Sequence, residues 1–389
     1  MTNQTEIRYI DSPAALDELC RQLSHVSWIA LDTEFMREKT YYPGLCLIQV
    51  ATPDLVACID PLAISDLSPF LDVIYDSSIT IVMHAARQDL EILYHLRGTL
   101  PAPVFDTQIA ALLLGLPDQT GYGNLVKAIL GVNLEKLHTR ADWSVRPLTR
   151  DQIKYAADDV IYLVEAYQQI VTRLTELGRI DWLADDFENL VDPALYNNQP
   201  ELAWLKVRGS NRLKGASLAI LQSLAHWREE TARRDDRPRG WLLKDDVLID
   251  IARHIPGTRQ ALGKIRGLHD GMLNKYGEQL LEAIQEAKDR QPAPFPRTDK
   301  RARLTPAQDA VVDVMMALVR ISGTDNSLNP AVLASRKQLE ELMVNGSNSA
   351  VMRGWRKKLV GDRLQALLDG HISLSVNDGK VVLHPPGTA

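Results

Sequence analysis

The chain has 389 residues, of which 45% are hydrophobic and 24% charged, a composition that excludes a disordered or fibrous protein. This length exceeds one ordinary core, so two or three domains are expected. The net charge of −6 is uneven, because residues 1–207 carry 15 basic and 29 acidic side chains whereas residues 208–303 carry 20 and 13. An acidic front joined to a basic middle fits a nuclease that attracts a nucleic-acid backbone, although neighbouring domains can also differ in charge without a shared function.

Targeting and cysteine patterns bear on where the protein works. No apolar run approaches the ~20 residues that span a bilayer, and the N-terminus lacks a basic and then apolar signal pattern. The three cysteines, Cys20, Cys46 and Cys58, show no CxxC spacing, which argues against a disulfide frame or a zinc site. We therefore expect a cytoplasmic protein that has no membrane partner.

The first half of the chain, to about residue 190, alternates strand-like and helical patterns, as α/β domains do. Strands are predicted at Trp28–Asp32, Cys46–Ala51, Val56–Ile59 and Ile79–Met83. Helices are predicted at Pro13–Leu23, Ala85–Leu96, Asp106–Leu114, Gly123–Leu130 and Thr149–Leu177. The polar, proline-punctuated stretch 192–200 is predicted to be a linker.

The second half is helical in pattern until the tail. Helices are predicted at 213–233, 244–254 and 277–288, and then at 305–321, 330–344 and 361–368. Residues 290–296, with three prolines at alternate positions, are predicted to be a short stiff connector between the two groups. The similar order of the groups suggests a duplicated all-helical unit, and residues 372–384 are predicted to form a small hairpin.

Four acidic side chains in the first half occur where the fold would bring them together. Asp32 and Glu34 follow an apolar strand and, being two residues apart, project from the same face. Asp89 begins the helix that follows a second β-branched strand. Tyr155 and Asp159 are four residues apart and so share one face of the long helix.

Four carboxylates at one strand end would repel one another strongly unless cations lay among them. The expected ions are Mg²⁺ or Mn²⁺, because no Cys or His accompanies the acids. Two such ions about 4 Å apart suit phosphodiester hydrolysis, one activating water and the other stabilising the leaving oxygen. Each acid taken singly has a plainer explanation, as a strand-end, helix-start or surface residue.

Longer segments carry a resemblance to a known family, and they read LDTEFMREKTYYPGLCLIQV, HAARQDLE, DTQIAALLLG and DWSVRPLTRDQIKYAADDVIYL. Together they resemble the ribonuclease D family of the DEDD exonucleases, in the tyrosine subclass whose third motif is Y-x-x-x-D. The two helical groups resemble paired HRDC domains. The resemblance implies an α/β ribonuclease H-like exonuclease domain at 1–195, followed by all-α HRDC domains at 205–290 and 300–375.

The resemblance also implies an activity, namely 3′-5′ exoribonuclease cleavage that releases 5′-mononucleotides from tRNA precursors and other structured RNAs with 3′ tails. Asp32, Glu34, Asp89 and Asp159 map onto the metal ligands for two Mg²⁺ or Mn²⁺ ions, and Tyr155 maps onto the residue that orients the attacking water. An unperturbed tyrosine has a pKa near 10, so we expect it to aim the water and not to act as a base. No oligomer is indicated.

Contacts with RNA are predicted at five further residues, each with an alternative. Phe35 could stack on the terminal base or belong to the core, and Arg146 could touch a phosphate or pack through its stem. A run of arginines between two tryptophans suits backbone attraction and base stacking, although acidic residues interrupt it. The arginines chosen from this run are Arg233, Arg234 and Arg237.

Two other polar residues, and two other functions, are weighed beside this interpretation. Gln49, within a strand, is expected to pair only locally, and His84 is expected to be structural. A DNA exonuclease of the same superfamily would carry the same acids, because the distinction depends on contacts to the 2′-hydroxyl. An inactive RNA-binding scaffold is disfavoured, because all four acids and the tyrosine are present.

Overall fold

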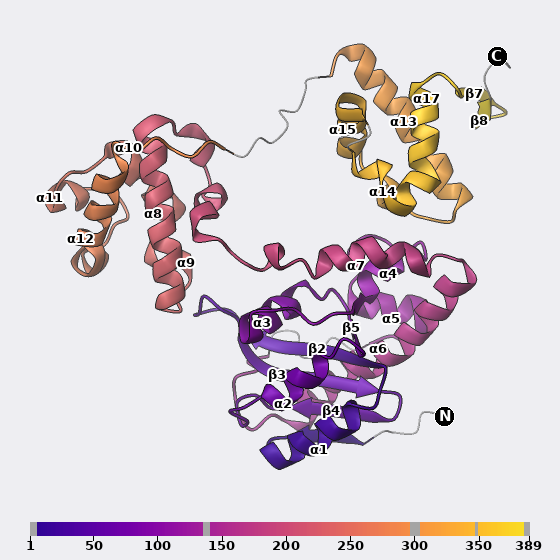
Figure 1. The fold of residues 1–389 in the computed structure, drawn as a ribbon, viewed down its shortest axis with the longest axis horizontal. Helices are drawn as coiled ribbons and strands as arrows, with labels where there is room; N and C mark the ends of the chain where they lie inside the picture. Colours follow the sequence, from indigo (N-terminus) through magenta and orange to yellow (C-terminus); the bar gives the residue numbers. More distant parts are fainter. Residues whose placement is uncertain (1–5, 135–140, 296–303, 347–348, 385–389) are drawn as a thin grey trace.

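The computed structural model describes residues 6–134, 141–295, 304–346 and 349–384. Figure 1 shows one domain built around a β-sheet and two separate groups of helices, which follow it along the chain. None of the helices among these residues is long and apolar enough to cross a membrane.

The strand that carries Asp32 and Glu34 lies near the centre of the sheet. Its six strands lie in the order β1-β4-β3-β2-β5-β6, with β2 antiparallel to β3 and parallel to β5. The strands are β1 (Ile7–Ile10), β2 (Trp28–Met36), β3 (Gly44–Thr52), β4 (Leu55–Ile59), β5 (Thr80–Met83) and β6 (Val104–Asp106).

Helices cover both faces of the sheet, because side chains alternate along each strand. On β2, Ile29 and Leu31 pack into the core on one face and Ala30 into the core on the other. The first face is covered by α1 (Pro13–Leu23), α2 (Ser68–Ile74) and α3 (Arg87–Arg97). The second is covered by α4 (Thr107–Leu112), α5 (Tyr122–Leu130) and α6 (Arg150–Glu176).

All four predicted strands and all five predicted helices of this domain are present, with β2 extended to Met36. Two strands and two α-helices of its described residues were not predicted, namely β1, β6, α2 and α7 (Ala184–Leu190). The strands β1 and β6 hold four and three residues at the two edges of the sheet, too few to display an alternating pattern.

The stretch 192–200 is not the free linker that its composition suggests. It follows α7 (Ala184–Leu190) and forms short 3₁₀ turns at Pro193–Leu195 and Pro200–Lys206. Tyr196 is 6% exposed and packs into the core beneath α3. Arg87 at the start of α3 lies over the Tyr196 ring and donates a hydrogen bond to the Leu195 carbonyl at 2.8 Å. The buried ring of Tyr196 thus holds this polar segment against the α/β domain.

The first helical domain contains α8 (Gly215–Arg234), α9 (Arg239–Leu242), α10 (Asp245–His254), α11 (Arg259–Leu262) and α12 (Asp270–Ala287) around a core of its own. The second contains α13 (Pro306–Asp325), α14 (Pro330–Leu333), α15 (Arg336–Asn345), α16 (Gly354–Arg356) and α17 (Asp362–Leu368), with a terminal hairpin of β7 (Ser373–Asn377) and β8 (Lys380–His384). The predicted start of this domain at residue 300, and the end of the predicted connector at 296, lie outside the described residues.

The helix predicted at 330–344 is instead two helices. Ser335 begins α15 with a capping box, in which its hydroxyl accepts from the Gln338 backbone N–H and the Gln338 side chain accepts from the Ser335 N–H. The capping serine takes an extended backbone conformation, so the helical path is interrupted there.

The first helical domain contacts the loop that follows β2. The Tyr41 phenol donates to the buried Glu229 carboxylate and accepts from Arg233 Nε at 3.3 Å. The backbone N–H groups of Tyr41 and Tyr42 donate to Asp236 Oδ1 at 2.9 and 3.1 Å. These contacts tie the first helical domain to the strand that carries Asp32 and Glu34.

The second helical domain contacts the turn after α6. Trp182 stacks on Trp355 with ring centroids 5.9 Å apart, and Trp355 Nε1 donates to Asp186 at 3.3 Å. Arg179 donates to the Asn326 carbonyl at 2.7 Å. Each helical domain is therefore joined to the α/β domain at a different place.

Candidate active site

The strand β2 presents two of the predicted acids on one face. Asp32 and Glu34 alternate with residues of the opposite face, so they project toward the side that α6 covers. The register with β3 shifts between Glu34 and Phe35, which is a β-bulge. Bulges bend a strand and redirect its side chains, and they are frequent beside active sites.

The third acid lies on the other side of the strand end. Asp89 is in the first turn of α3, is 7% exposed, and accepts a hydrogen bond from the Thr33 hydroxyl at 2.5 Å. The turn before α3 contains Ala85 in the left-handed region at φ 57°, a conformation that costs an L-residue about 1–2 kcal/mol.

Asp106 fixes this strained turn. Its carboxylate accepts from the Ala85 N–H at 3.2 Å, the Ala86 N–H at 2.9 Å and the Gln108 N–H at 2.7 Å. It thereby caps α4 and at the same time sets the start of α3, the helix that carries Asp89.

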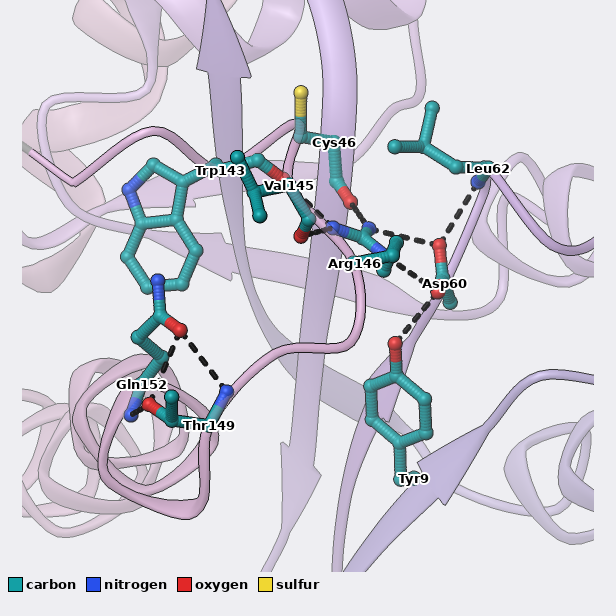
Figure 2. Close-up of polar contacts among 9 residues, drawn as sticks. All are labelled: Tyr9, Cys46, Asp60, Leu62, Trp143, Val145, Arg146, Thr149 and Gln152. Atoms are coloured by element: carbon teal, nitrogen blue, oxygen red, sulfur yellow. Dashed lines mark hydrogen bonds and ion pairs between the residues drawn. The ribbon is translucent and has the colours of Figure 1, made fainter.

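The long helix α6 carries Tyr155 and Asp159. Its first residue is preceded by a capping box, in which the Thr149 hydroxyl accepts from the Gln152 N–H and the Gln152 side chain accepts from the Thr149 N–H (Figure 2). The Tyr155 ring lies 6.2 Å from the ring of Trp143, nearly parallel to it. This packing orients the phenol one helical turn from Asp159.

The acids are close enough to influence one another electrostatically. Burial raises the pKa of Asp32 above its usual range, and the charge of Asp159 raises it further. Burial and then the charge of Asp32 raise the pKa of Asp89, and burial and then Asp158 raise that of Asp159. Burial, followed by the charges of Asp32, Asp159 and Asp89, raises the pKa of Glu34 to about 9. The site is therefore an acidic cluster, with Asp89 buried and the other three acids half-buried, that favours a cation or a proton.

Two tyrosines face this cluster. Burial, and then the charges of Asp159, Glu34 and Asp32, raise the pKa of Tyr155 to about 12. Burial, and then the charges of Asp159 and Asp32, raise the pKa of Tyr122 well above its usual value. Both phenols thus keep their protons at neutral pH, so they can donate and accept hydrogen bonds and orient water but do not act as bases.

The donor set fits hard divalent cations, because it offers carboxylate oxygens without thiolate or imidazole. However, no group of three or more His, Cys, Asp or Glu residues in the described part of the chain is arranged to hold an ion. Asp89 is instead bound to Thr33. Ion binding would therefore require the carboxylates to rotate toward one another from their places on β2, α3 and α6.

Arg146, predicted as a phosphate contact, is used inside the protein. Its guanidinium donates to both oxygens of Asp60, at 2.6 and 2.8 Å, and to the carbonyls of Cys46, Trp143 and Val145 (Figure 2). These bonds occupy all five N–H donors of an arginine. The structure therefore gives the phosphate contact no support and assigns Arg146 to joining the segment before α6 to the sheet.

The other residues predicted to contact RNA differ in their exposure and in their partners within the protein. Phe35 is half-buried and belongs to none of the hydrophobic clusters of the described residues. Arg233 is engaged by Tyr41, and Arg234 donates to Asp235 at 3.0 Å. Arg237 is exposed in the connection between α8 and α9. Among the three arginines, Arg237 is therefore the one best placed to meet an external ligand.

His84 matches its expected structural role. Nδ1 lies 3.0 Å from the Thr107 hydroxyl and Nε2 lies 3.0 Å from the Thr120 carbonyl. Burial lowers the pKa of this imidazole, which keeps it neutral.

Sequence reasoning overlooked two residues of the site, Asp106 and Tyr122. An aspartate before an apolar helix is a helix-start signal that could have indicated the capping of α4, but no local pattern indicates the bonds to the turn before α3. Tyr122 carried no local signal, because its place depends on α5 packing beside α6, where its phenol donates to the Asp158 carbonyl at 3.2 Å.

Comparison with known proteins shows which class of protein this fold and these acids belong to. Residues 7–175 match the 3′-5′ exonuclease family, and residues 217–284 match the HRDC domain. A mixed sheet between two helical layers, with half-buried acids at the end of its central strand, is thus the catalytic domain of a 3′-5′ exonuclease.

Whole-chain relatives define the particular family. Ribonuclease D of Sphingobium indicum is 40% identical over 380 residues, covering 96% of this chain and 97% of that protein. Ribonuclease D of Zymomonas mobilis is 39% identical, covering 96% and 97%. The crystal structure of Escherichia coli RNase D, an exoribonuclease involved in structured RNA processing, has a TM-score of 0.80 and 31% identity, covering 94% of this chain and 99% of that one. The chain belongs to the ribonuclease D family of exoribonucleases.

Proposed function

We propose that this protein hydrolyses the last phosphodiester at the 3′ end of RNA and releases 5′-mononucleotides, using two divalent cations, Mg²⁺ or Mn²⁺. The observation that carries the proposal is the cluster of four interacting carboxylates on β2, α3 and α6, of which Asp89 is buried and the other three are half-buried. Asp32, Glu34, Asp89 and Asp159 would hold the cations. When bound, such ions lower the pKa of water and neutralise charge on the leaving oxygen.

The protein's own side chains supply orientation. The Tyr155 phenol, which stays protonated, hydrogen-bonds the attacking water and aims it at phosphorus. Half-buried Phe35, beside the bulge after Glu34, stacks on the terminal base. Asp106 holds α3, so that Asp89 stays at the strand end.

Both helical domains would hold the RNA upstream of the cut. The second is an HRDC domain like the first, since each begins with a 20-residue helix, a four-residue helix and a 10-residue helix in the same order. In the first, Trp241 is 60% exposed, close in sequence to the exposed Arg237. An exposed indole beside a cation suits stacking on a base and attraction to phosphate.

The substrates we propose are tRNA precursors and other structured RNAs with 3′ tails, in agreement with the structured-RNA role named for the Escherichia coli protein. The cytoplasmic location expected from the sequence stays a prediction.

The test is digestion of a 5′-labelled tRNA that carries extra 3′ nucleotides, with products resolved by length. We expect stepwise shortening and 5′-mononucleotides with Mg²⁺ or Mn²⁺, and no cleavage with a chelator. A DNA oligonucleotide matched to the RNA tail is run in parallel. Faster cleavage of the DNA would reassign the substrate, and cleavage that persists in the chelator would overturn the cation mechanism.

A further inference from the structure

Gln49 is a fully buried amide at the edge of the acidic cluster. It lies on β3, is 0% exposed, and is directly opposite Asp32 in the β2–β3 register. Leu47 and Ala51, two residues to either side, pack into the core that α6 covers. Gln49 alternates in step with them, so its side chain and that of Asp32 project from the same face of the sheet.

The buried amide of Gln49 destabilises the fold. In the described part of the chain neither Oε1 nor Nε2 of Gln49 has a hydrogen-bond partner. A buried amide without partners destabilises a fold, and an apolar side chain of the same shape removes that cost. On the other side of Gln49, the β4 neighbour Cys58 directs its thiol to the Ile153 carbonyl at 3.9 Å and offers the amide no partner in the structure.

A partner lies within reach across the strand pair. Residues directly opposite on antiparallel strands have Cβ atoms roughly 4.5–5.5 Å apart, which a glutamine side chain can bridge. The Asp32 carboxylate offers oxygens with lone pairs to spare, and an aspartate bound to a cation through one oxygen leaves the other free to accept. Groups of this kind behind a metal ligand set its direction.

We propose that Gln49 is a positioning residue for Asp32. Its Nε2 donates to the outer oxygen of the Asp32 carboxylate and turns the inner oxygen toward a divalent cation. The inference rests on the proposed cation-dependent function, and it assigns to Gln49 a role that local strand pairing does not explain.

The test compares wild type with Gln49→Met, which keeps the length of the side chain and removes the amide. For the metal-free protein in chelator, we expect the variant to have the higher melting temperature, by roughly 2–4 °C, because an unsatisfied amide is gone. By calorimetric titration with Mn²⁺ we expect a Kd about 10-fold weaker than wild type, with kcat lowered and KM for RNA unchanged. Gain of stability with loss of ion affinity is a combination that a purely structural role does not produce.

Two further variants complete the series. Cys58→Ala, on the same sheet face but one strand farther from Asp32, should lower the melting temperature and leave Mn²⁺ affinity unchanged. Gln49→Asn, which keeps a shorter amide, should have an intermediate Mn²⁺ affinity. Equal affinities in wild type and Gln49→Met, or equal losses in Gln49→Met and Gln49→Asn, would overturn the role of Gln49. Absence of Mn²⁺ binding by wild type itself would instead refute the proposed function.

Discussion

Tyr155 illustrates how its surroundings decide what a side chain can do. Burial and three nearby carboxylates raise its pKa to about 12, so the phenol does not take up a proton from water at neutral pH. It remains a hydrogen-bond donor and acceptor held beside Trp143. Its contribution to the reaction is therefore geometric.

Replacing Tyr155 with phenylalanine should slow turnover roughly 10- to 100-fold, because a misdirected water loses alignment. Mn²⁺ affinity should stay within about twofold of wild type, since the four carboxylates are untouched. Single-turnover kinetics and Mn²⁺ titration measure the two effects. Tyr75→Phe is the matched control, because that phenol bonds to the Leu93 carbonyl away from the acids. Loss of ion binding in Tyr155→Phe would contradict an orienting role.

Asp60 gives a second prediction, on stability against pH. Burial alone would raise its pKa, but hydrogen bonds from Arg146 and Tyr9 and from the backbone lower it to about 2. The unfolded value is near 3.9, so the ionised, paired carboxylate stabilises the fold by about 2–3 kcal/mol at pH 7. This contribution is complete above about pH 4 and disappears as pH falls through about 2.

Urea unfolding of wild type and Asp60→Asn measures this contribution. The difference in the free energy of unfolding should be largest at pH 7 and roughly half as large at pH 3. Asp54→Asn, at an exposed carboxylate in the turn between β3 and β4, should differ little from wild type at either pH. A difference for Asp60→Asn that does not change with pH would rule out the ion pair as its source.

Individual side-chain partners were the least predictable part of the molecule. The sequence places Asp32 and Glu34 on one strand face and Tyr155 and Asp159 on one helix face, because those relations are local. The pairing of Arg146 with Asp60, 86 residues away, depends on the folded sheet. No local pattern could therefore show that this guanidinium is already occupied and is not free to bind a phosphate.

At the scale of elements, the long pieces were predictable and the short ones were not. The 27-residue α6 and the nine-residue strands β2 and β3 have enough residues to display their period. The shorter β4 and β5 are continuous apolar runs rich in β-branched residues, which is the pattern of a buried strand. The edge strands β1 and β6 are held by parallel pairing with β4 and β5, a stabilisation that comes from the neighbouring strand. A serine N-cap likewise divided the predicted helix 330–344 into α14 and α15.

The capping box before α6 yields a prediction at this scale. Thr149→Ala should lower the free energy of unfolding by about 1 kcal/mol and also slow turnover, because Tyr155 lies in the second turn of the helix that it caps. Thr305 makes the same capping box at the start of α13 in the second helical domain, so Thr305→Ala should cost similar stability without slowing turnover on a short RNA. Denaturant unfolding and steady-state kinetics of both variants decide the matter. Equal turnover in the two variants would show that the cap does not support the site.

Two junctions join the helical domains to the α/β domain. Tyr41 joins the first helical domain to the loop after β2, and Trp355 stacks on Trp182 to join the second. The acidic catalytic domain and the basic first helical domain are thereby kept beside each other, which suits an RNA that must reach the acids from a basic surface.

Tyr41→Ala should release the first helical domain, since it removes the contacts of the ring and phenol with Glu229 and Arg233. We expect the radius of gyration from small-angle scattering to rise by several ångströms, with little change in the circular dichroism spectrum. Trp241→Ala, at an exposed side chain, should leave the radius of gyration unchanged. An unaltered scattering curve for Tyr41→Ala would mean that other contacts hold the domain.

Anomalous diffraction from a crystal soaked in Mn²⁺ tests the central claim most directly. We predict two peaks at the end of β2, each within roughly 2.0–2.6 Å of carboxylate oxygens from Asp32, Glu34, Asp89 or Asp159, and loss of the peaks in Asp32→Ala. A soaked crystal with no anomalous density there, and with the carboxylates still directed apart, would contradict a cation-dependent nuclease.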